Sequence, residues 1–174
     1  MNQMVTPIAN RESTPGWIET DDDNGTYDLG LGGQGPGPWV NITGLSITVP
    51  FDTSPGDRLD AYVELHAVGK IPAMAGDIEI GFGLNGSPPF SGTRATVESN
   101  FDGIVPVSVS TEIVTLIAGD VINVFARDAV DGNPAFGVDI DATTGSTHKL
   151  VVVKDVQELT GFQLSQVAIV GTSL

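Results

Sequence analysis

The 174-residue chain contains no cysteine, which excludes disulfides and thiolate metal sites. Its fold therefore does not depend on the redox state of a compartment. No stretch comes near the ~18 consecutive apolar residues of a membrane span, and residues 1–15 lack a basic segment followed by an apolar one. We therefore expect a soluble protein without a signal peptide, made in the cytoplasm.

Basic residues are also scarce. Seven Lys and Arg stand against 22 Asp and Glu, which gives a formal net charge of −15. A surface of this charge repels phosphate groups, so we expect neither nucleic acid nor an anionic membrane as a partner. Only 17% of the residues are charged, while 40% are hydrophobic and 22 residues are glycine. This composition is too apolar for a disordered chain and unlike that of a helical protein.

The apolar residues alternate with polar ones. From Leu59 to Ala67 every second residue is apolar, and the residues between them are Asp, Tyr, Glu and His. The same alternation runs over residues 77–84 and 105–110 and predicts half-buried strands. Between Trp39 and Val49 the alternation changes phase, which predicts a bulge near Thr43-Gly44. Because turn residues separate these runs about every 10–15 positions, we expect an all-β protein, an antiparallel β-sandwich of the jelly-roll type.

Two of the expected strands are apolar on both faces, namely Val121–Arg127 and Leu150–Val153. A sandwich strand normally keeps one face in water. The second apolar face therefore lies either beneath another layer of the same chain or against another subunit. Under the second interpretation, the candidate subunit-interface residues are Val121, Phe125, Val151 and Val153.

Met1–Gly16 mixes polar residues with Pro7 and Pro15, and Gly30–Pro38 reads GLGGQGPGP. Such segments do not build a core by themselves. We therefore divide the chain into an N-terminal arm with a Gly/Pro-rich loop over residues 1–36 and a jelly-roll domain over residues 37–174. The string Gly30–Gly35 also matches G-x-G-x-x-G, but prolines and a strand-like run follow where a dinucleotide site needs a helix. It is therefore interpreted as a loop.

Three successive carboxylates, Asp21, Asp22 and Asp23, stand beside a turn glycine and form a candidate calcium site. The alternative is a solvated acidic turn, since the EF-hand spacing is not met. Asp139 and Asp141, which share one face of an expected strand, are a second candidate. Apart from calcium, we expect no cofactor.

Catalytic patterns are missing. The two histidines, His66 and His148, have no G-x-S-x-G serine to activate, so we expect them at the surface or in an interface. Glu64, Glu79 and Glu98 could pair as glycosidase carboxylates, but acidic residues are ordinary on the wet face of a sheet. We therefore expect no catalytic residues and no enzymatic activity.

The order of features resembles the compact jelly rolls of the TNF/C1q-like type over residues 37–174. The resemblance rests on a small set of segments. These are Trp39–Ile42 with Leu45–Val49, Gly56–Leu59, Leu116–Val124 and Thr147–Val153. Within them, the turn Ala118-Gly119-Asp120 between aliphatic runs is the most specific piece.

The resemblance implies a tight homotrimer. Small, acidic, cysteine-free versions of this type resemble accessory virion proteins of tailed phages, among them capsid-decoration (cement) proteins and fibres. It implies a structural protein on the outer capsid surface of the virion, with the major capsid protein as its partner. An N-terminal arm would bind the capsid, and its candidate contact residues are Met4, Val5, Pro7, Ile8 and Arg11. The alternative is a carbohydrate- or receptor-binding module at a fibre or tail tip, with Trp17, Tyr27 or Tyr62 as stacking platforms near Asp21–Asp23.

Overall fold

The computed structural model describes residues 17–30, 36–53, 59–69, 75–89, 94–100, 104–113, 115–129, 137–142 and 146–154. Its strands, in chain order, are β1 (Trp17–Asp23), β2 (Thr26–Tyr27), β3 (Val40–Thr48), β4 (Leu59–Gly69), β5 (Ala75–Leu84), β6 (Arg94–Asn100), β7 (Ile104–Ile113), β8 (Val121–Asp128), β9 (Val138–Asp141) and β10 (His148–Lys154). Within these ranges no helix has the length and apolar character needed to cross a membrane. The expected all-β class is confirmed.

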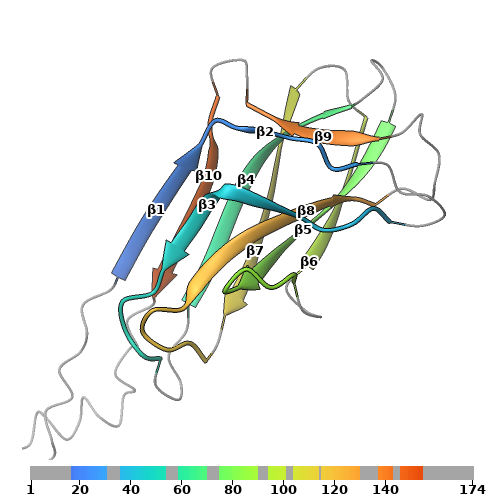
Figure 1. The fold of residues 1–174 in the computed structure, drawn as a ribbon. Coiled ribbons are helices and arrows are strands. Elements are labelled where there is room, and N and C mark those ends of the chain that lie inside the picture. The colour runs from blue at the N-terminus through green and yellow to red at the C-terminus, as the bar shows by residue number, and fades with distance from the viewer. Residues whose placement is uncertain are drawn as a thin grey trace, which may run out of the picture.

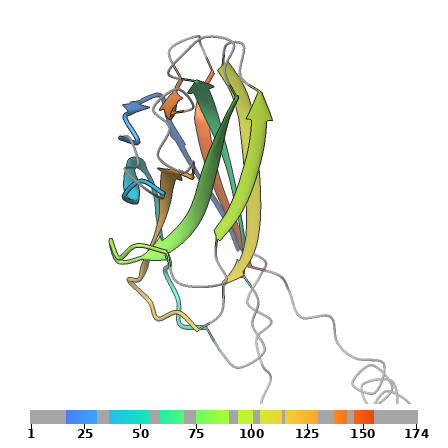
Figure 2. The same cartoon turned by 90° about the vertical axis from the view of Figure 1, so that its right-hand side faces the viewer.

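The strands form two antiparallel sheets that pack face to face (Figures 1 and 2). In sheet A, β1 pairs with β10 and β2 pairs with β9, while β10 and β9 pair with successive parts of β4. Strand β7 pairs with β4 along its other edge. Sheet B has the order β3-β8-β5-β6.

The path of the chain through these sheets is that of a jelly roll. β1 and β2 can be counted as one interrupted strand, and so can β9 and β10. Each sheet then has four strands. Successive strands then alternate between the sheets, except that the hairpin of β5 and β6 stays in sheet B. This eight-strand arrangement is the double Greek key of a jelly roll, as the turn spacing predicts.

The core lies between the two sheets and is built from the residues that alternation assigns to the inner faces. All five apolar residues of Leu59–Ala67 have no exposed area, and Ile78 and Ile80 of β5 are equally buried. From sheet A, Leu150 and Val152 complete the same cluster. Period-2 patterning therefore identifies the inner faces correctly.

The phase change in β3 is a bulge. The pairing of β3 with β8 shifts register between Asn41 and Ser46, which contains the expected Thr43-Gly44 position. Four residues of β3 lie there against one of β8. The extra residues allow Ile42 and Leu45, on either side of Thr43-Gly44, both to be fully buried. They also bring the bulged backbone close to β1 of the other sheet.

The sandwich starts earlier than the sequence suggested. Residues 17–27, assigned to the arm, form β1 and β2 and complete sheet A, and Leu29 has no exposed area. The acidic segment Asp21–Asp23 is the end of a strand rather than a turn. Alternation did not reveal β1 because its inward positions are one tryptophan followed by Glu19, Asp21 and Asp23.

Candidate functional site

The outward side chains of sheet A form its outer face, and the register places them in rows. Directly opposite residues in an antiparallel pair point to the same side of the sheet. Ile18 of β1 lies opposite Val153 of β10, which lies opposite Asp60 of β4. In the next row, Thr20, Val151 and Tyr62 are opposite one another. The sequence alone could not assign these neighbours because strand order was unknown.

Four apolar side chains meet on this face, and we call them the apolar patch: Ile18, Tyr62, Val151 and Val153. Ile18 is 63% exposed and Tyr62 is 39% exposed, while the two valines are half-buried. The inward neighbours of the valines already fill the core. Within the described part of the chain, the patch is therefore an apolar surface that the core does not use, and it contains two of the four predicted interface residues.

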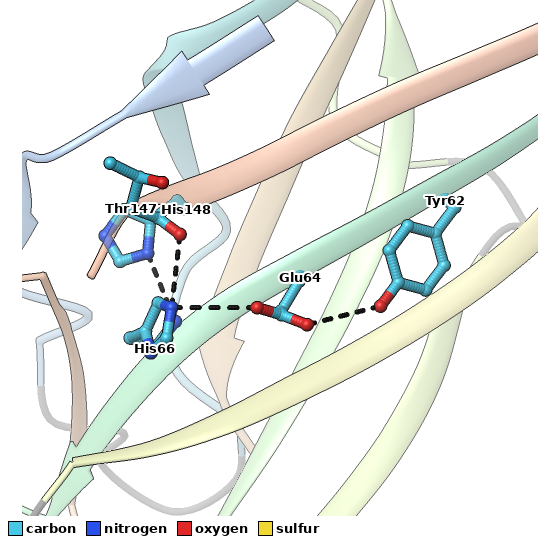
Figure 3. Close-up of polar contacts among 5 residues, drawn as sticks. All are labelled: Tyr62, Glu64, His66, Thr147 and His148. Atoms are coloured by element: carbon cyan, nitrogen blue, oxygen red, sulfur yellow. Dashed lines mark hydrogen bonds and ion pairs between the residues drawn. The ribbon is translucent and has the colours of Figure 1, made fainter. Parts of the chain in front are cut away.

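Polar side chains follow one another along β4, starting from Tyr62 of the patch (Figure 3). The Tyr62 hydroxyl donates to Glu64 Oε2 at 3.4 Å, and Glu64 Oε1 lies 3.8 Å from His66 Nε2. His66 Nε2 also lies 3.1 Å from the Thr147 carbonyl oxygen. Because a carbonyl only accepts, Nε2 carries the proton and donates it. His66 is thus held by a backbone acceptor and not by a hydroxyl that it could activate.

His148 is buried, contrary to the expectation of a surface or interface histidine. It is the first residue of β10, and it lies where β4 changes its pairing partner, from β10 as far as Glu64 to β9 from Ala67 onward. The backbone N–H of His66 donates to His148 Nδ1 at 3.1 Å, and His148 Nε2 lies 3.0 Å from the Gly25 carbonyl oxygen. The imidazole therefore replaces a missing stretch of ladder by bridging β4 to the junction of β1 and β2.

These contacts determine the tautomer of His148. Nδ1 accepts from a backbone N–H, so it carries no proton, and Nε2 must carry the proton that it donates to Gly25. Burial is the main cause that lowers the pKa of His148 below its ordinary value, although the contact with Gly25 opposes this change. Protonation of Nδ1 would place a second N–H against that of His66.

Two of the three predicted calcium ligands hold the sheets together at one edge. Asp21 Oδ2 accepts from the backbone N–H of Ser46 at 2.8 Å. Asp23 Oδ2 accepts from the Tyr27 hydroxyl at 2.8 Å, and that hydroxyl accepts from the backbone N–H of Gly44 at 3.0 Å. Burial and the bond to Asp23 raise the pKa of Tyr27. Asp21 thus binds the bulge of β3 directly, and Asp23 binds it through the Tyr27 hydroxyl.

The expected calcium ligands do not converge. Strand geometry directs Asp22 to the face opposite Asp21 and Asp23. Asp139 accepts from the Leu29 backbone N–H at 3.1 Å, and Asp141 accepts from the Thr26 hydroxyl at 3.2 Å. Over the described ranges, no three His, Cys, Asp or Glu side chains cluster to hold a metal ion.

A groove of about 340 Å³ runs between β1 and β3, the edge strands of the two sheets. It is lined by Trp17, Glu19, Thr20, Asp21, Ser46, Ile47, Thr48 and Pro50. The Trp17 ring packs edge-on against Phe51, with centroids 5.2 Å apart. The groove therefore combines one aromatic ring with carboxylates and hydroxyls.

The other predicted interface residues, Val121 and Phe125, point outward from sheet B. Phe125 is only 3% exposed, because the turn after β5 folds over it. The backbone N–H of Gly86 donates to Asn123 at 2.7 Å, and Gly83 leaves room for the Phe125 ring beside the Ser87 carbonyl. At Phe125, the second apolar face of β8 is thus covered by another layer of the same chain. Val121 remains half-buried.

Glu64 and Glu79 do not form an acidic pair. Glu64 projects from the outer face of sheet A, whereas Glu79 lies on sheet B, with the sandwich between them. Glu79 forms an ion pair with Arg127, whose guanidinium lies 4.5 Å from the Trp39 ring centroid. Glu98 occupies β6 opposite Asp77.

Asp120, in the most specific segment of the resemblance, stabilises a turn. Its carboxylate accepts from the Asn85 side chain at 2.8 Å and from the Ile117 backbone N–H at 2.9 Å. These bonds lower the pKa of Asp120. The Gly-Asp pair therefore has a local structural role. The predicted capsid-contact residues Met4, Val5, Pro7, Ile8 and Arg11 lie outside the described residues.

No family model matches the chain, and no curated protein matches it. Among solved structures, it is similar to a carbohydrate-binding module (CBM6cm-2) from Cellvibrio mixtus lichenase 5A in complex with cellotriose. The TM-score is 0.38 and the identity 13%, over 84% of this chain and 92% of that chain. It is also similar to a chain of Broad Bean Stain Virus, with a TM-score of 0.30 and 12% identity over 90% of this chain and 91% of that chain. These similarities concern the fold alone.

Proposed function

We propose that this chain is a non-enzymatic virion structural protein, a homotrimeric capsid-decoration protein bound to the outer face of a phage head. The observation that supports this proposal is the apolar patch on strands whose inner faces already fill the core. Buried apolar area contributes about 25 cal/mol per Å², and a decoration protein multiplies a modest contact over many copies. The major capsid protein would be the partner.

Internal contacts of the titratable side chains support a role without turnover. Glu79 is paired with Arg127, and His66 donates to a backbone carbonyl. Asp21 accepts from the Ser46 backbone N–H, and Asp23 accepts from the Tyr27 hydroxyl. Each of these groups already has a structural partner. An active site, by contrast, requires a nucleophile or an acid–base group directed at a substrate.

Cosedimentation tests this proposal. The purified chain is expected to sediment with capsids that lack it, and deletion of residues 1–15 is expected to abolish sedimentation without changing the melting temperature. The deletion lies before β1, so the sandwich is the internal control. Light scattering is expected to give three times the chain mass of 18.1 kDa. Normal capsid binding by the truncated chain would disprove the role of the arm, and failure of the intact chain to bind would disprove the proposal.

The groove between β1 and β3 favours a second candidate function, binding of carbohydrate at a fibre or tail tip. A saccharide offers a ring face to tryptophan and hydroxyls to carboxylates, and the groove holds Trp17 near Glu19 and Asp21. Soluble oligosaccharides are then expected to change the fluorescence of the wild type but not that of Trp17→Phe, which retains Trp39. A flat titration of the wild type across a glycan panel, with and without calcium, would rule out this function.

A further inference from the structure

We propose that the outer face of sheet A docks a protein surface that is both apolar and cationic, rather than a second copy of this chain. The inference starts from the apolar patch of Ile18, Tyr62, Val151 and Val153. Four strands contribute outward side chains to this face, so it is a broad surface and not a crevice for a small molecule.

Carboxylates surround the patch. Asp60 of β4 lies between Val153 of β10 and Glu112 of β7. Asp22 and Glu64 flank Lys149 in the row next to that of Val151. Lys149 is the only lysine or arginine in the described rows of this face. A partner with lysine or arginine around an aliphatic centre would therefore match the face both in polarity and in charge.

A second copy of this chain matches the charge of the face less well. Each copy carries a formal charge of −15, so placing two such acidic faces against each other adds like-charge repulsion. The terminal segments outside the described residues, 1–16 and 155–174, contain Arg11 against Glu12, Asp155 and Glu158. With one basic side chain against three acidic ones, these segments also match the acidic face poorly in charge. Val151 and Val153, predicted to contact another subunit, would therefore contact a different protein.

The inference deepens the proposed function, because in a decoration protein the cationic surface would belong to the shell. Its test does not require the shell. The probes are three synthetic ten-residue peptides with alternating leucine and lysine, leucine and glutamate, or serine and lysine. The leucine–lysine peptide is expected to bind, the leucine–glutamate peptide not to bind, and the serine–lysine peptide to bind at least about tenfold more weakly.

A matched pair of variants locates the site. Ile18→Ser combined with Tyr62→Ser is expected to weaken leucine–lysine binding at least about tenfold. Ile117→Ser is the control, since Ile117 is 64% exposed, almost the same as Ile18 at 63%, but lies on the turn between β7 and β8. Ile117→Ser is expected to bind as the wild type does. Both changes replace exposed side chains, so the fold should persist.

Three results would overturn the inference. One is equal binding by the double variant and the wild type, and another is no binding by the wild type. The third is a fall in oligomer mass caused by the double variant in light scattering, which would assign the patch to a second copy. The proposed function fails separately: capsids that do not bind the wild type would disprove it, whatever the peptides show.

Discussion

Replacement of His148 with leucine is expected to lower the free energy of unfolding by about 2–6 kcal/mol. Leucine fills most of the space but leaves the His66 N–H and the Gly25 carbonyl without their imidazole partner. Each unsatisfied buried group costs about 1–3 kcal/mol. Urea denaturation at pH 8 measures the change. His66→Leu is the control, because that ring bonds the carbonyl of Thr147, an exposed residue, and the change is expected to cost about 1 kcal/mol.

The same histidine should make stability depend on pH. Its folded pKa is lowered, so the unfolded chain binds the proton more readily than the folded one. Its contribution is therefore complete above the ordinary histidine pKa of about 6.5 and decreases as the pH falls below that value, by at most about 1.4 kcal/mol per pH unit. The stability advantage of the wild type over His148→Leu is expected to be smaller at pH 5 than at pH 8. Carboxylates common to both chains cancel in this difference, and a constant difference would contradict the assignment.

Gly83→Ala is expected to destabilise the protein by about 3 kcal/mol, the upper part of the usual range for overpacking. A Cβ at this position would lie 2.1 Å from the Ser87 carbonyl oxygen and 2.5 Å from the Phe125 ring. Since the obstacle is backbone, the turn over β8 would have to lift and expose Phe125. Urea denaturation measures the loss, and binding of a hydrophobic dye reports the exposed ring.

Gly37→Ala is the matched control for this prediction. Its added Cβ would meet Leu29 and Asp128 atoms at 3.4–3.7 Å, which is ordinary contact, and it is expected to change stability by less than about 1 kcal/mol. Similar effects of the two alanines would show that loss of glycine itself, and not the packing of the turn, causes the change.

The inner faces of the sandwich were predictable because burial imposes a local pattern. Residues such as Leu59 and Ile80 follow an alternation that any half-buried strand must have. The bulge in β3 was predictable for the same reason, since a change of phase needs an odd number of extra residues, although the sequence did not show that there are three. Strand order was not predictable, and with it the meeting of Ile18, Val151 and Tyr62, because those contacts join segments more than 40 positions apart.

The remaining features depend on contacts that leave no periodic signal. The inward carboxylates of β1 accept hydrogen bonds, Asp21 from the Ser46 backbone N–H and Asp23 from the Tyr27 hydroxyl, so the sequence of this strand resembles an acidic turn. His148 is buried because its ring accepts from the His66 backbone N–H and donates to the Gly25 carbonyl, between the stretches of β4 that pair with β10 and with β9. Phe125 was predicted to contact another subunit, with a second layer of the same chain as the alternative. Only the fold reveals that residues 85–87 supply such a layer.

The register of β1 and β10 also determines how the sandwich would respond to force. Trp17 lies opposite Lys154, so the two strands meet the flanking segments at the same end of sheet A (Figure 1). Tension applied between those segments would load the hydrogen-bonded pairs one after another, as in a zipper, and not all together as in shear. The molecule would therefore peel open mechanically at low force, beginning with Trp17, even if its thermal unfolding required a high temperature.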